Sequence, residues 1–554
     1  MMRGSAFGFA WILALATAAP SAAQSGEGST KAERPNIVFI MTDDHAQTAI
    51  SAYGTEIGRL APTPNIDRIA QNGALFENSY VTNSLCGPSR ATMLTGQFSH
   101  MHGFTRNGQR FDNGQWNWVR ALGQSGYRTA LFGKWHLNYS PEGAGIDDWA
   151  VLDDQGKYYN PDIITPGGRN VVEGYATDIV TDLSIDWLEE NARSDEPFAI
   201  LIHHKAPHRN FMPALRHVQK YIGTEFPVPT NYFDHYDGRP AAADQEMSIY
   251  EHMYEGHDLK MTLEEGSSEL RFNPWTDDFK RMTPEQRATY FGALQPENDA
   301  MNAAEMSDRE MAIWKYQRYM HEYLGTVAAV DESVGRVLDW LEATGKADNT
   351  IVVYTSDQGF YLGEHGWFDK RFMYEESLRT PLVMQYPGHI APGTRVSVPV
   401  QNVDYAPTFL DYAGLPDRAT IQGRSLRDVT GGSPPRDWRE DVYYHYYEYP
   451  GFHAVRAHYG VKSGRYKLMR FYGDINQWEF YDLQTDPSEM DNRIDDPSVQ
   501  PIVRGLKEKL KDLRARYRDG DGPAVDDPVT MASAIAKGRR DADAAAGSGH
   551  HDHH

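Results

Sequence analysis

The sequence predicts an α/β protein in which a large, mixed but mostly parallel sheet is sandwiched by helices. Four apolar runs have the length and composition of strands buried on both faces, namely residues 36–41, 128–132, 198–202 and 351–355. Helical patterns lie between these runs, and the clearest covers residues 324–341 and ends at Gly345. Polar residues follow each run directly, as at the ligand-binding edge of such a sheet.

The C-terminal part of the chain predicts a smaller α+β domain with an antiparallel sheet. Four short strand patterns lie at residues 442–449, 459–462, 465–472 and 479–483. An amphipathic helix pattern follows at residues 501–517. The composition changes after Pro435, so we expect a large domain over residues 35–435 and a small one over residues 436–518. Within the large domain, residues 226–297 have few strand signals and predict an insertion that frames a pocket.

The two ends of the chain have compositions unlike the rest. Arg3, an apolar stretch over residues 7–19 and the small residues 21–23 are typical of an export signal over residues 1–23. Residues 24–34 predict a linker, and the Ala-, Asp- and Gly-rich residues 519–554 predict a disordered tail. The apolar stretch is too short to span a bilayer. We therefore expect an exported protein, periplasmic or extracellular, with no membrane span.

Charge and cysteine content limit the classes of function. The chain of 554 residues has a formal net charge of −23, which argues against nucleic acid as a partner. Any site for an anion must therefore be made locally positive by a metal ion or by clustered basic side chains. The chain has one cysteine, Cys86, which excludes an internal disulfide.

The polar residues that follow the four strands indicate one shared site. They are Asp43 and Asp44, then Lys134 and His136, then His203, His204, Lys205 and His208, and finally Asp357 and Gln358. Because ligands bind beyond the carboxyl ends of the strands in open α/β sheets, we expect these segments to converge.

Three carboxylates and one amide in this set predict a metal site. Asp43, Asp44, Asp357 and Gln358 offer oxygen ligands, which suit Ca²⁺, with Mg²⁺ as the alternative. Asp43 and Asp44 alone could equally form a turn or cap a helix. The second pair after another strand favours the metal site.

Cys86 lies in the run Cys86-Gly87-Pro88-Ser89-Arg90. Pro88 suits the first turn of a helix that would end at Gly96. Cys86 would then lie at a helix N-terminus, where negative charge is favoured. The alternative is that Cys86 is a small buried apolar side chain.

These segments resemble the motifs of type I, formylglycine-dependent sulfatases of the alkaline phosphatase superfamily, over about residues 35–515. The Cys86 run matches the family's C-x-P-S-R motif, and residues 36–44 resemble its opening strand with paired metal aspartates. Further matches lie at residues 133–136, 204–208, 355–359 and around Lys370 in residues 369–377. Gln358 departs from the pattern because many relatives carry Asn there.

The resemblance implies a mechanism in which Cys86 is oxidised to formylglycine by a formylglycine-generating or anaerobic sulfatase-maturating enzyme. A hydroxyl of the hydrated aldehyde, held on the cation with Asp43, Asp44, Asp357 and Gln358, would attack sulfur. The implied roles of the other residues are charge stabilisation by Arg90, Lys134 and Lys370, leaving-group protonation by His208, and proton removal by His136 when sulfate is released. Such cations would screen an anionic ester.

Other stretches resemble bacterial N-acetylglucosamine-6-sulfatases, namely residues 203–210, 233–239, 245–249 and 257–261. The implied substrate is a 6-O-sulfated N-acetylglucosamine at a glycan end, and His453 is our candidate for sugar binding. Two alternatives stay open. One is a phosphonate monoester or phosphodiester hydrolase of the same superfamily, and the other is a non-catalytic glycan-binding protein.

Overall fold

The computed structural model describes residues 34–192, 196–275 and 277–519. The predicted export signal and all but the first residue of the predicted tail lie outside the described residues. Within them, no helix combines the length and apolar character needed to cross a membrane.

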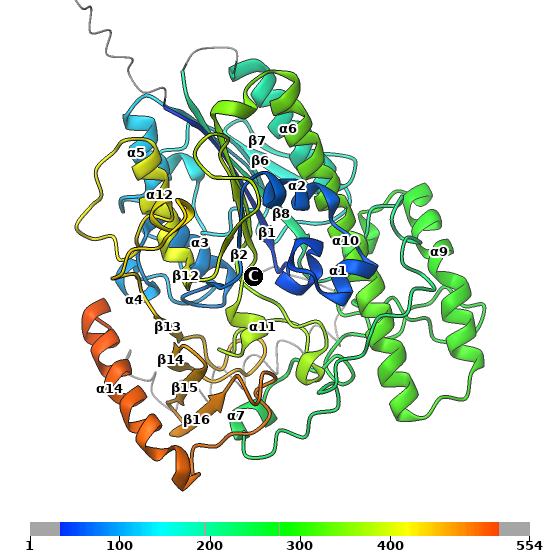
Figure 1. Ribbon diagram of the computed structural model, residues 1–554. Coiled ribbons are helices and arrows are strands. Elements are labelled where there is room, and N and C mark those ends of the chain that lie inside the picture. The colour runs from blue at the N-terminus through cyan, green and yellow to red at the C-terminus, as the bar shows by residue number, and fades with distance from the viewer. Residues whose placement is uncertain (1–33, 193–195, 276, 520–554) are drawn as a thin grey trace, which may run out of the picture. The chain divides into compact units, whose positions relative to one another are not determined.

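A ten-stranded mixed sheet forms the centre of the described chain (Figure 1). Its middle strands β9, β1, β8 and β4 are neighbours in that order and run parallel. They are the four predicted strands, and they span Thr350–Ser356, Asn36–Asp43, Phe198–Pro207 and Arg128–Gly133. Antiparallel pairs occur nearer the edges, which makes the sheet mixed, as predicted.

The remaining strands of this sheet are β2 (Ala74–Phe76), β5 (Asp148–Leu152), β6 (Asp162–Thr165), β7 (Gly168–Val171), β10 (Leu382–Gln385) and β11 (Thr394–Val396). Strands β3 (Ser79–Tyr80) and β12 (Val400–Gln401) form a separate pair.

Helices cover both faces of the large sheet because alternate residues of the strands enter two different cores. Ile37 and Phe39 of β1 share a cluster with side chains of α3 (Cys86–Thr95), α5 (Trp118–Gln124) and α12 (Tyr405–Tyr412). Val38 and Ile40 face α2 (Pro64–Asn72), α6 (Ala176–Asn191) and α10 (Asp308–Ala343). This alternation confirms the predicted helix–sheet–helix layers. Short helices α1 (Glu56–Leu60), α4 (Ser99–His102), α11 (Glu375–Leu378) and α13 (Arg427–Thr430) complete the large region.

Helix α10 begins well before the predicted helical pattern. Ser307 and Glu310 form a capping box at its N-terminus, which satisfies free backbone N–H groups. The early turns pack aromatic residues such as Tyr316 and Tyr319 into a separate cluster. Because Lys315, Arg318 and Glu322 are buried in the same turns, the apolar period is obscured in the sequence.

The described residues of the predicted insertion, 226–297, form no strand, as expected. They contain α7 (Pro240–Ala243), α8 (Asp277–Lys280) and the start of α9 (Pro284–Ala303). Loops connect these helices and contribute Phe226, Tyr232 and Leu259 to the cluster around α10.

The C-terminal antiparallel sheet is confirmed, with strand order β13-β14-β15-β16. These strands span Asp441–Tyr446, His458–Ser463, Tyr466–Phe471 and Gln477–Asp482. Helix α14 (Gln500–Tyr517) packs Leu506 and Leu510 against this sheet. Asp519, which we expected to begin the tail, is buried and bonded to Nδ1 of His445 at 2.6 Å. The domain boundary at residue 435 stays a prediction.

Candidate active site

The polar segments predicted to converge do so at the carboxyl edge of the parallel strands. Asp43 ends β1, Lys134 follows β4, and Asp357 follows β9. Gly133 permits this geometry because it has φ +105°, and a Cβ there would overlap the carbonyl oxygen of His203. Carboxylate oxygens of Asp43, Asp44 and Asp357 lie within 4.8 Å of one another and are buried.

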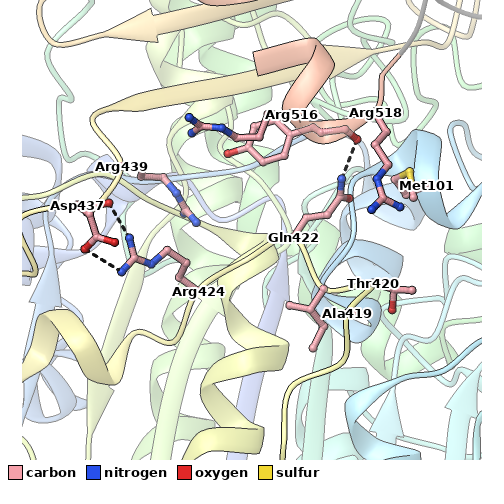
Figure 2. A pocket seen from close by; sticks show the side chains of 11 residues that line it. Met101, Ala419, Thr420, Gln422, Arg424, Asp437, Arg439, Arg516 and Arg518 are labelled. Atoms are coloured by element: carbon pink, nitrogen blue, oxygen red, sulfur yellow. Dashed lines mark hydrogen bonds and ion pairs between the residues drawn. The ribbon is translucent and has the colours of Figure 1, made fainter. Parts of the chain in front are cut away.

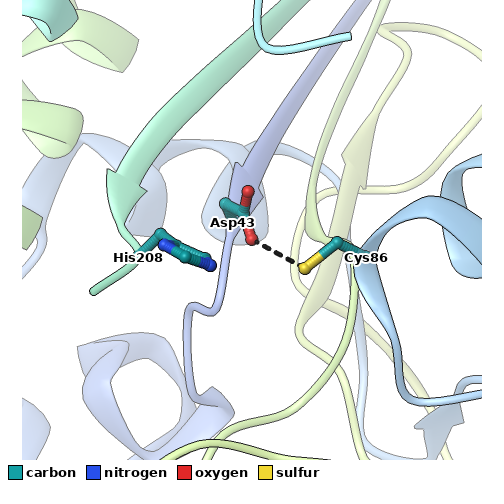
Figure 3. A group of neighbouring side chains, drawn as sticks. All are labelled: Asp43, Cys86 and His208. Carbon is teal, nitrogen blue, oxygen red and sulfur yellow. Dashed lines mark hydrogen bonds between the residues drawn. The ribbon is translucent and has the colours of Figure 1, made fainter. Parts of the chain in front are cut away.

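Cys86 is the first residue of α3 and is buried, as predicted, at the helix N-terminus. Its Sγ donates to Oδ1 of Asp43 at 3.3 Å, and His208 lies in the same group (Figure 3). Burial and the nearby Asp43 carboxylate raise the pKa of the Cys86 thiol well above its ordinary value. The unmodified thiol therefore stays protonated and is a poor nucleophile.

The carboxylate cluster has the properties that a divalent cation requires. Burial and neighbouring carboxylates raise the pKa of Asp44 to about 8 and that of Asp357 to about 6. Two buried oxygens, Oδ2 of Asp44 and Oε1 of Gln358, have no hydrogen-bond partner among the described residues. Oxygen ligands of this kind suit a hard cation, so the residues present fit the expected Ca²⁺ or Mg²⁺.

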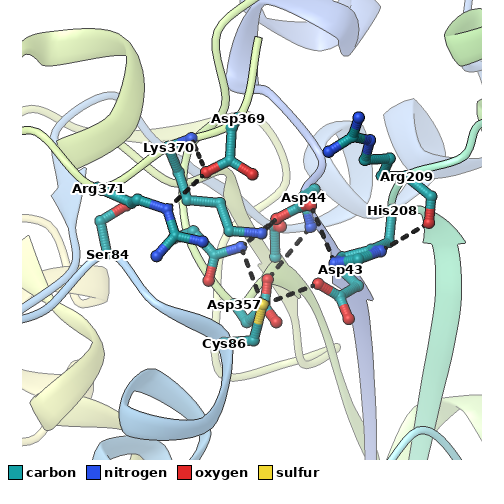
Figure 4. A network of polar contacts seen from close by, with 12 residues as sticks. Asp43, Asp44, Ser84, Cys86, His208, Arg209, Asp357, Asp369, Lys370 and Arg371 are labelled. Atoms are coloured by element: carbon teal, nitrogen blue, oxygen red, sulfur yellow. Dashed lines mark hydrogen bonds and ion pairs between the residues drawn. The ribbon is translucent and has the colours of Figure 1, made fainter. Parts of the chain in front are cut away.

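Three buried basic side chains surround the same carboxylates, and Figure 4 labels one of them, Lys370. Arg90 donates from Nε and Nη2 to Oδ2 of Asp357, at 3.1 and 2.9 Å, and from Nη2 to Asp43 at 3.3 Å. Lys134 forms an ion pair with Asp43, and Nζ of Lys370 lies 2.5 Å from Oδ1 of Asp44. These basic side chains offset the three carboxylates, and a bound divalent cation would then make the site positive enough to receive an anion despite the charge of the whole chain.

Opposing effects act on the pKa of Asp43. Burial raises it, but the charges of Lys134, Arg90 and Lys370 together outweigh burial and hold it well below its ordinary value. Asp43 is therefore the carboxylate of the cluster that stays ionised most readily.

His208 is the site residue with the clearest access to solvent, with 17% of its side chain exposed. Its Nδ1 lies 2.8 Å from the carbonyl oxygen of Arg209, which makes Nδ1 the protonated nitrogen. Nε2 then faces the cluster, 3.7 Å from Oδ2 of Asp44. Burial and the charge of Lys134 lower the pKa of His208, so the ring is neutral before an anion enters.

His136 lies near Lys134 and is also neutral, because burial and the charge of Lys134 lower its pKa. Its Nε2 lies 3.1 Å from Nε2 of Gln155, while its Nδ1 has no partner among the described residues. Nζ of Lys134 also donates to Gln155. Gln155 thus connects two predicted site residues. The sequence did not predict it, because no pattern around it distinguishes it from any other loop glutamine.

The other strand-end residues do not join the site. His203 packs against Phe39 in the core. His204 lies on the other face of the large sheet, where its Nε2 is hydrogen-bonded to Oγ of Ser333 at 3.0 Å. Lys205 lies over the ring of Tyr158.

Two charged residues beside Lys370 were also missed. Asp369 and Arg371 have φ values of +75° and +94°, and Arg371 Nε donates to Oδ1 of Asp369 at 2.9 Å. A signal was present, since Asp369-Lys370-Arg371 is a charged triplet within an aromatic run. His453 is buried beside them, with Nε2 3.3 Å from Oδ2 of Asp369 and Nδ1 2.7 Å from the carbonyl oxygen of Glu246.

A pocket of about 950 Å³ lies beside His453, and its lining includes Arg209, Glu246, Tyr254, Phe452 and Arg456. The Arg209 guanidinium lies over the rings of Tyr254 and Phe452, at 4.6 and 6.0 Å. Aromatic faces and paired charges of this kind suit a sugar next to the polar cluster.

The fold and this cluster of carboxylates, cations and a helix-terminal cysteine define a hydrolase for anionic esters. The chain belongs to the sulfatase family, which matches residues 35–415 under the description "Sulfatase". A second family, described as "N-sulphoglucosamine sulphohydrolase, C-terminal", matches residues 363–516. The chain is thus a sulfuric ester hydrolase.

Named relatives agree with this assignment. The chain is 47% identical over 495 residues to an N-acetylglucosamine-6-O-sulfatase of Bacteroides thetaiotaomicron, with 88% of each chain covered. It is 26% identical over 439 residues to the human N-acetylglucosamine-6-sulfatase, covering 74% of this chain and 67% of the human protein. Among solved structures, one bound to its substrate D-glucosamine-2-N,6-O-disulfate matches with a TM-score of 0.83 and 46% identity, covering 88% of this chain and 99% of the other.

Proposed function

We propose that this sulfatase removes the 6-O-sulfate from N-acetylglucosamine at the ends of glycans. The inference of hydrolysis rests mainly on the position of Cys86. It lies at a helix N-terminus, against Asp43 and His208 and beside three buried basic side chains. The choice of sugar is supported by similarity to the N-acetylglucosamine-6-O-sulfatase of Bacteroides and the human N-acetylglucosamine-6-sulfatase.

Formylglycine made from Cys86 would supply, once hydrated, the hydroxyl nucleophile, and a divalent cation would lower the pKa of that hydroxyl. Asp43, Asp44, Asp357 and Gln358 would hold the cation. We assign Ca²⁺ first because all four residues offer oxygen ligands, with Mg²⁺ as the alternative.

Arg90, Lys134 and Lys370 would bind the equatorial oxygens of the sulfate ester and stabilise the negative charge that develops on them. All three are buried, where such charges act strongly and need no reorganisation during the reaction. Their present carboxylate partners hold them in place before the substrate arrives.

His208 would donate the proton to the departing sugar oxygen. Its bond to the Arg209 carbonyl fixes Nε2 toward the cluster, and the negative charge of a bound sulfate ester would raise its low pKa. His136 would accept a proton when sulfate is released, because burial and the charge of Lys134 keep its ring neutral beforehand.

Asp369 and Arg371 would bind the hydroxyl groups of the sugar, with His453 as a positioning residue. Asp369 and Arg371 are buried, point their polar atoms toward each other beside Lys370, and so form a preorganised pair (Figure 4). His453 would act by orienting Asp369, because both of its ring nitrogens already have neighbours.

We also propose export of the protein and maturation of Cys86 by a formylglycine-generating or anaerobic sulfatase-maturating enzyme. Export is supported by the signal-like residues 1–23 and by similarity to extracellular sulfatase homologues of Caenorhabditis elegans and Drosophila melanogaster, each 29% identical over 416 residues.

Sulfate release from a panel of substrates tests the proposal. The panel contains N-acetylglucosamine sulfated at O6, O3 or O4, a 2-O-sulfated uronate and a phosphodiester. We expect a preference of at least about 100-fold for the 6-O-sulfate, since a site built for particular polar groups discriminates strongly against analogues that lack them. Faster phosphodiester turnover would favour the phosphonate monoester and phosphodiester hydrolases instead.

A further inference from the structure

A second pocket, of about 270 Å³, lies between the end of α14 and residues 419–424 (Figure 2). It shares no described lining residue with the candidate active site. Four arginines line it, together with a single carboxylate, that of Asp437; the arginines are Arg424, Arg439, Arg516 and Arg518. This concentration of positive charge is unusual in a chain whose formal net charge is −23.

Two of the four guanidinium groups are already engaged. The side chain of Arg439 is 7% exposed and paired with Asp404, and Arg424 donates to the carbonyl oxygen of Asp437 at 2.7 Å. The exposed side chains of Arg516 and Arg518 form no hydrogen bond or ion pair with any described residue. In Figure 2 no dashed line meets the guanidinium group of Arg516 or of Arg518. The pocket therefore has a fixed cationic wall and two cations free to bind a ligand.

The remaining lining is suited to a sugar ring. Met101, Ala419 and Ile421 supply apolar contact, and Thr420 supplies a hydroxyl. Gln422 is held in place, since its Nε2 donates to the carbonyl oxygen of Tyr517 at 2.8 Å and its Oε1 accepts from the N–H of Phe98 at 2.9 Å. Apolar surface with a few fixed polar groups is typical of small-ligand pockets.

The positive charge continues along the exposed side of α14. The exposed residues of this helix include five basic and two acidic ones, namely Arg504, Lys507, Lys509, Lys511 and Arg516 against Glu508 and Asp512. Lys509 is paired with Asp441 and Lys511 with Glu508, which leaves Arg504, Lys507 and Arg516 without a paired carboxylate among the described residues. Attraction of cations to a helix C-terminus explains basic residues in the last turn only. It does not explain the cations in the earlier turns.

We propose that the arginine pocket and the exposed cations of α14 bind a sulfated glycan chain through anionic groups remote from the ester that is hydrolysed. The pocket would hold one sulfated sugar, and the helix would contact further sulfates along the chain. Such a surface would raise the local concentration of an anionic polymer around a protein that otherwise repels it. The proposal takes only its choice of ligand from the proposed function.

Binding of a heparin dodecasaccharide, measured by calorimetry at 0.15 M salt, tests this proposal without turnover. The double variant Arg516→Ser/Arg518→Ser is expected to bind about threefold to thirtyfold more weakly, as two exposed ion pairs would contribute. Its hydrolysis of monomeric 6-O-sulfated N-acetylglucosamine should be unchanged. The matched control is Lys220→Ser/Lys346→Ser, which removes the same charge elsewhere and should bind heparin like the parent.

Three results would overturn the proposal: unchanged heparin affinity of the arginine variant, an equal loss in the lysine control, or equally tight binding of an unsulfated hyaluronan dodecasaccharide. None of them bears on the proposed function, because the monosaccharide assay reports on that function separately.

Discussion

The Sγ atom of Cys86 lies 3.3 Å from Oδ1 of Asp43, although the two residues belong to different elements, α3 and β1. Asp43 also pairs with Arg90 and Lys134, so one carboxylate connects the cysteine to the cations. Any group made from Cys86 is therefore held against the carboxylate cluster.

Cys86→Ala is expected to abolish sulfate release while leaving the fold intact, because the substitution removes one buried atom and costs about 1 kcal/mol of stability. Sulfate release and thermal unfolding should be measured together. Ser84→Ala, two residues earlier and also buried, is the control. Activity of Cys86→Ala within tenfold of the parent would exclude Cys86 as the source of the nucleophile.

Removal of divalent cations with a chelator is expected to abolish activity and to lower the melting temperature. A cation that binds only the folded state adds about 2.7 kcal/mol of stability at one hundred times its Kd. Ca²⁺ should restore both properties more effectively than Mg²⁺. The metal content of the restored protein should be measured as well, and a metal-free protein with full activity would contradict the assigned site.

His208→Gln is expected to lower kcat for a sugar sulfate by about 100-fold to 10,000-fold, the usual contribution of a general acid. The loss should be much smaller for an aryl sulfate, whose leaving group needs no proton. Kinetics on both substrates check this, with His389→Gln at an exposed histidine as the control. Equal losses on the two substrates would argue against proton donation by His208.

His453→Gln is expected to raise KM for 6-O-sulfated N-acetylglucosamine about tenfold with a smaller change in kcat, because removing one orienting contact to Asp369 costs about 1–2 kcal/mol of binding. Arg371→Lys should act in the same direction. Steady-state kinetics on the sugar and on an aryl sulfate separate sugar binding from chemistry. A fall in kcat on both substrates with KM unchanged would place His453 in the chemical step instead.

Glu479 of β16 predicts a pH dependence of stability. It is buried and accepts hydrogen bonds from Tyr374 and Tyr481, both at 2.8 Å, and burial raises its pKa to about 7. Between its ordinary pKa and pH 7 the folded state keeps a proton that the unfolded state has lost, so the free energy of unfolding falls as pH rises.

Glu479→Gln keeps both hydrogen bonds and removes the titration. Between pH 4.5 and pH 8, the free energy of unfolding of the variant should rise by about 2–3 kcal/mol relative to that of the parent. Urea unfolding at the two pH values measures this gain, and Glu508→Gln at an exposed position should show none. The same difference between Glu479→Gln and the parent at both pH values would contradict the assigned pKa.

The sequence was sufficient for the central strands and for the residues that follow them, because each is a continuous apolar run with polar residues at its end. Cys86 and the carboxylates were found because their chemistry is rare in such positions. Asp369 and Gln155 were not, since their roles depend on loops whose φ values and contacts have no periodic signal. The early turns of α10 were missed for a related reason, because their buried faces contain Tyr, Lys and Arg.

The central claim is that Cys86 becomes the nucleophile, and mass spectrometry of the tryptic peptide over residues 69–90 tests it most directly. Conversion to formylglycine makes this peptide about 18 Da lighter. Across preparations with different degrees of conversion, we predict that specific activity toward 6-O-sulfated N-acetylglucosamine rises in proportion to the lighter peptide. Full activity in a preparation that contains only the unmodified thiol would contradict the account.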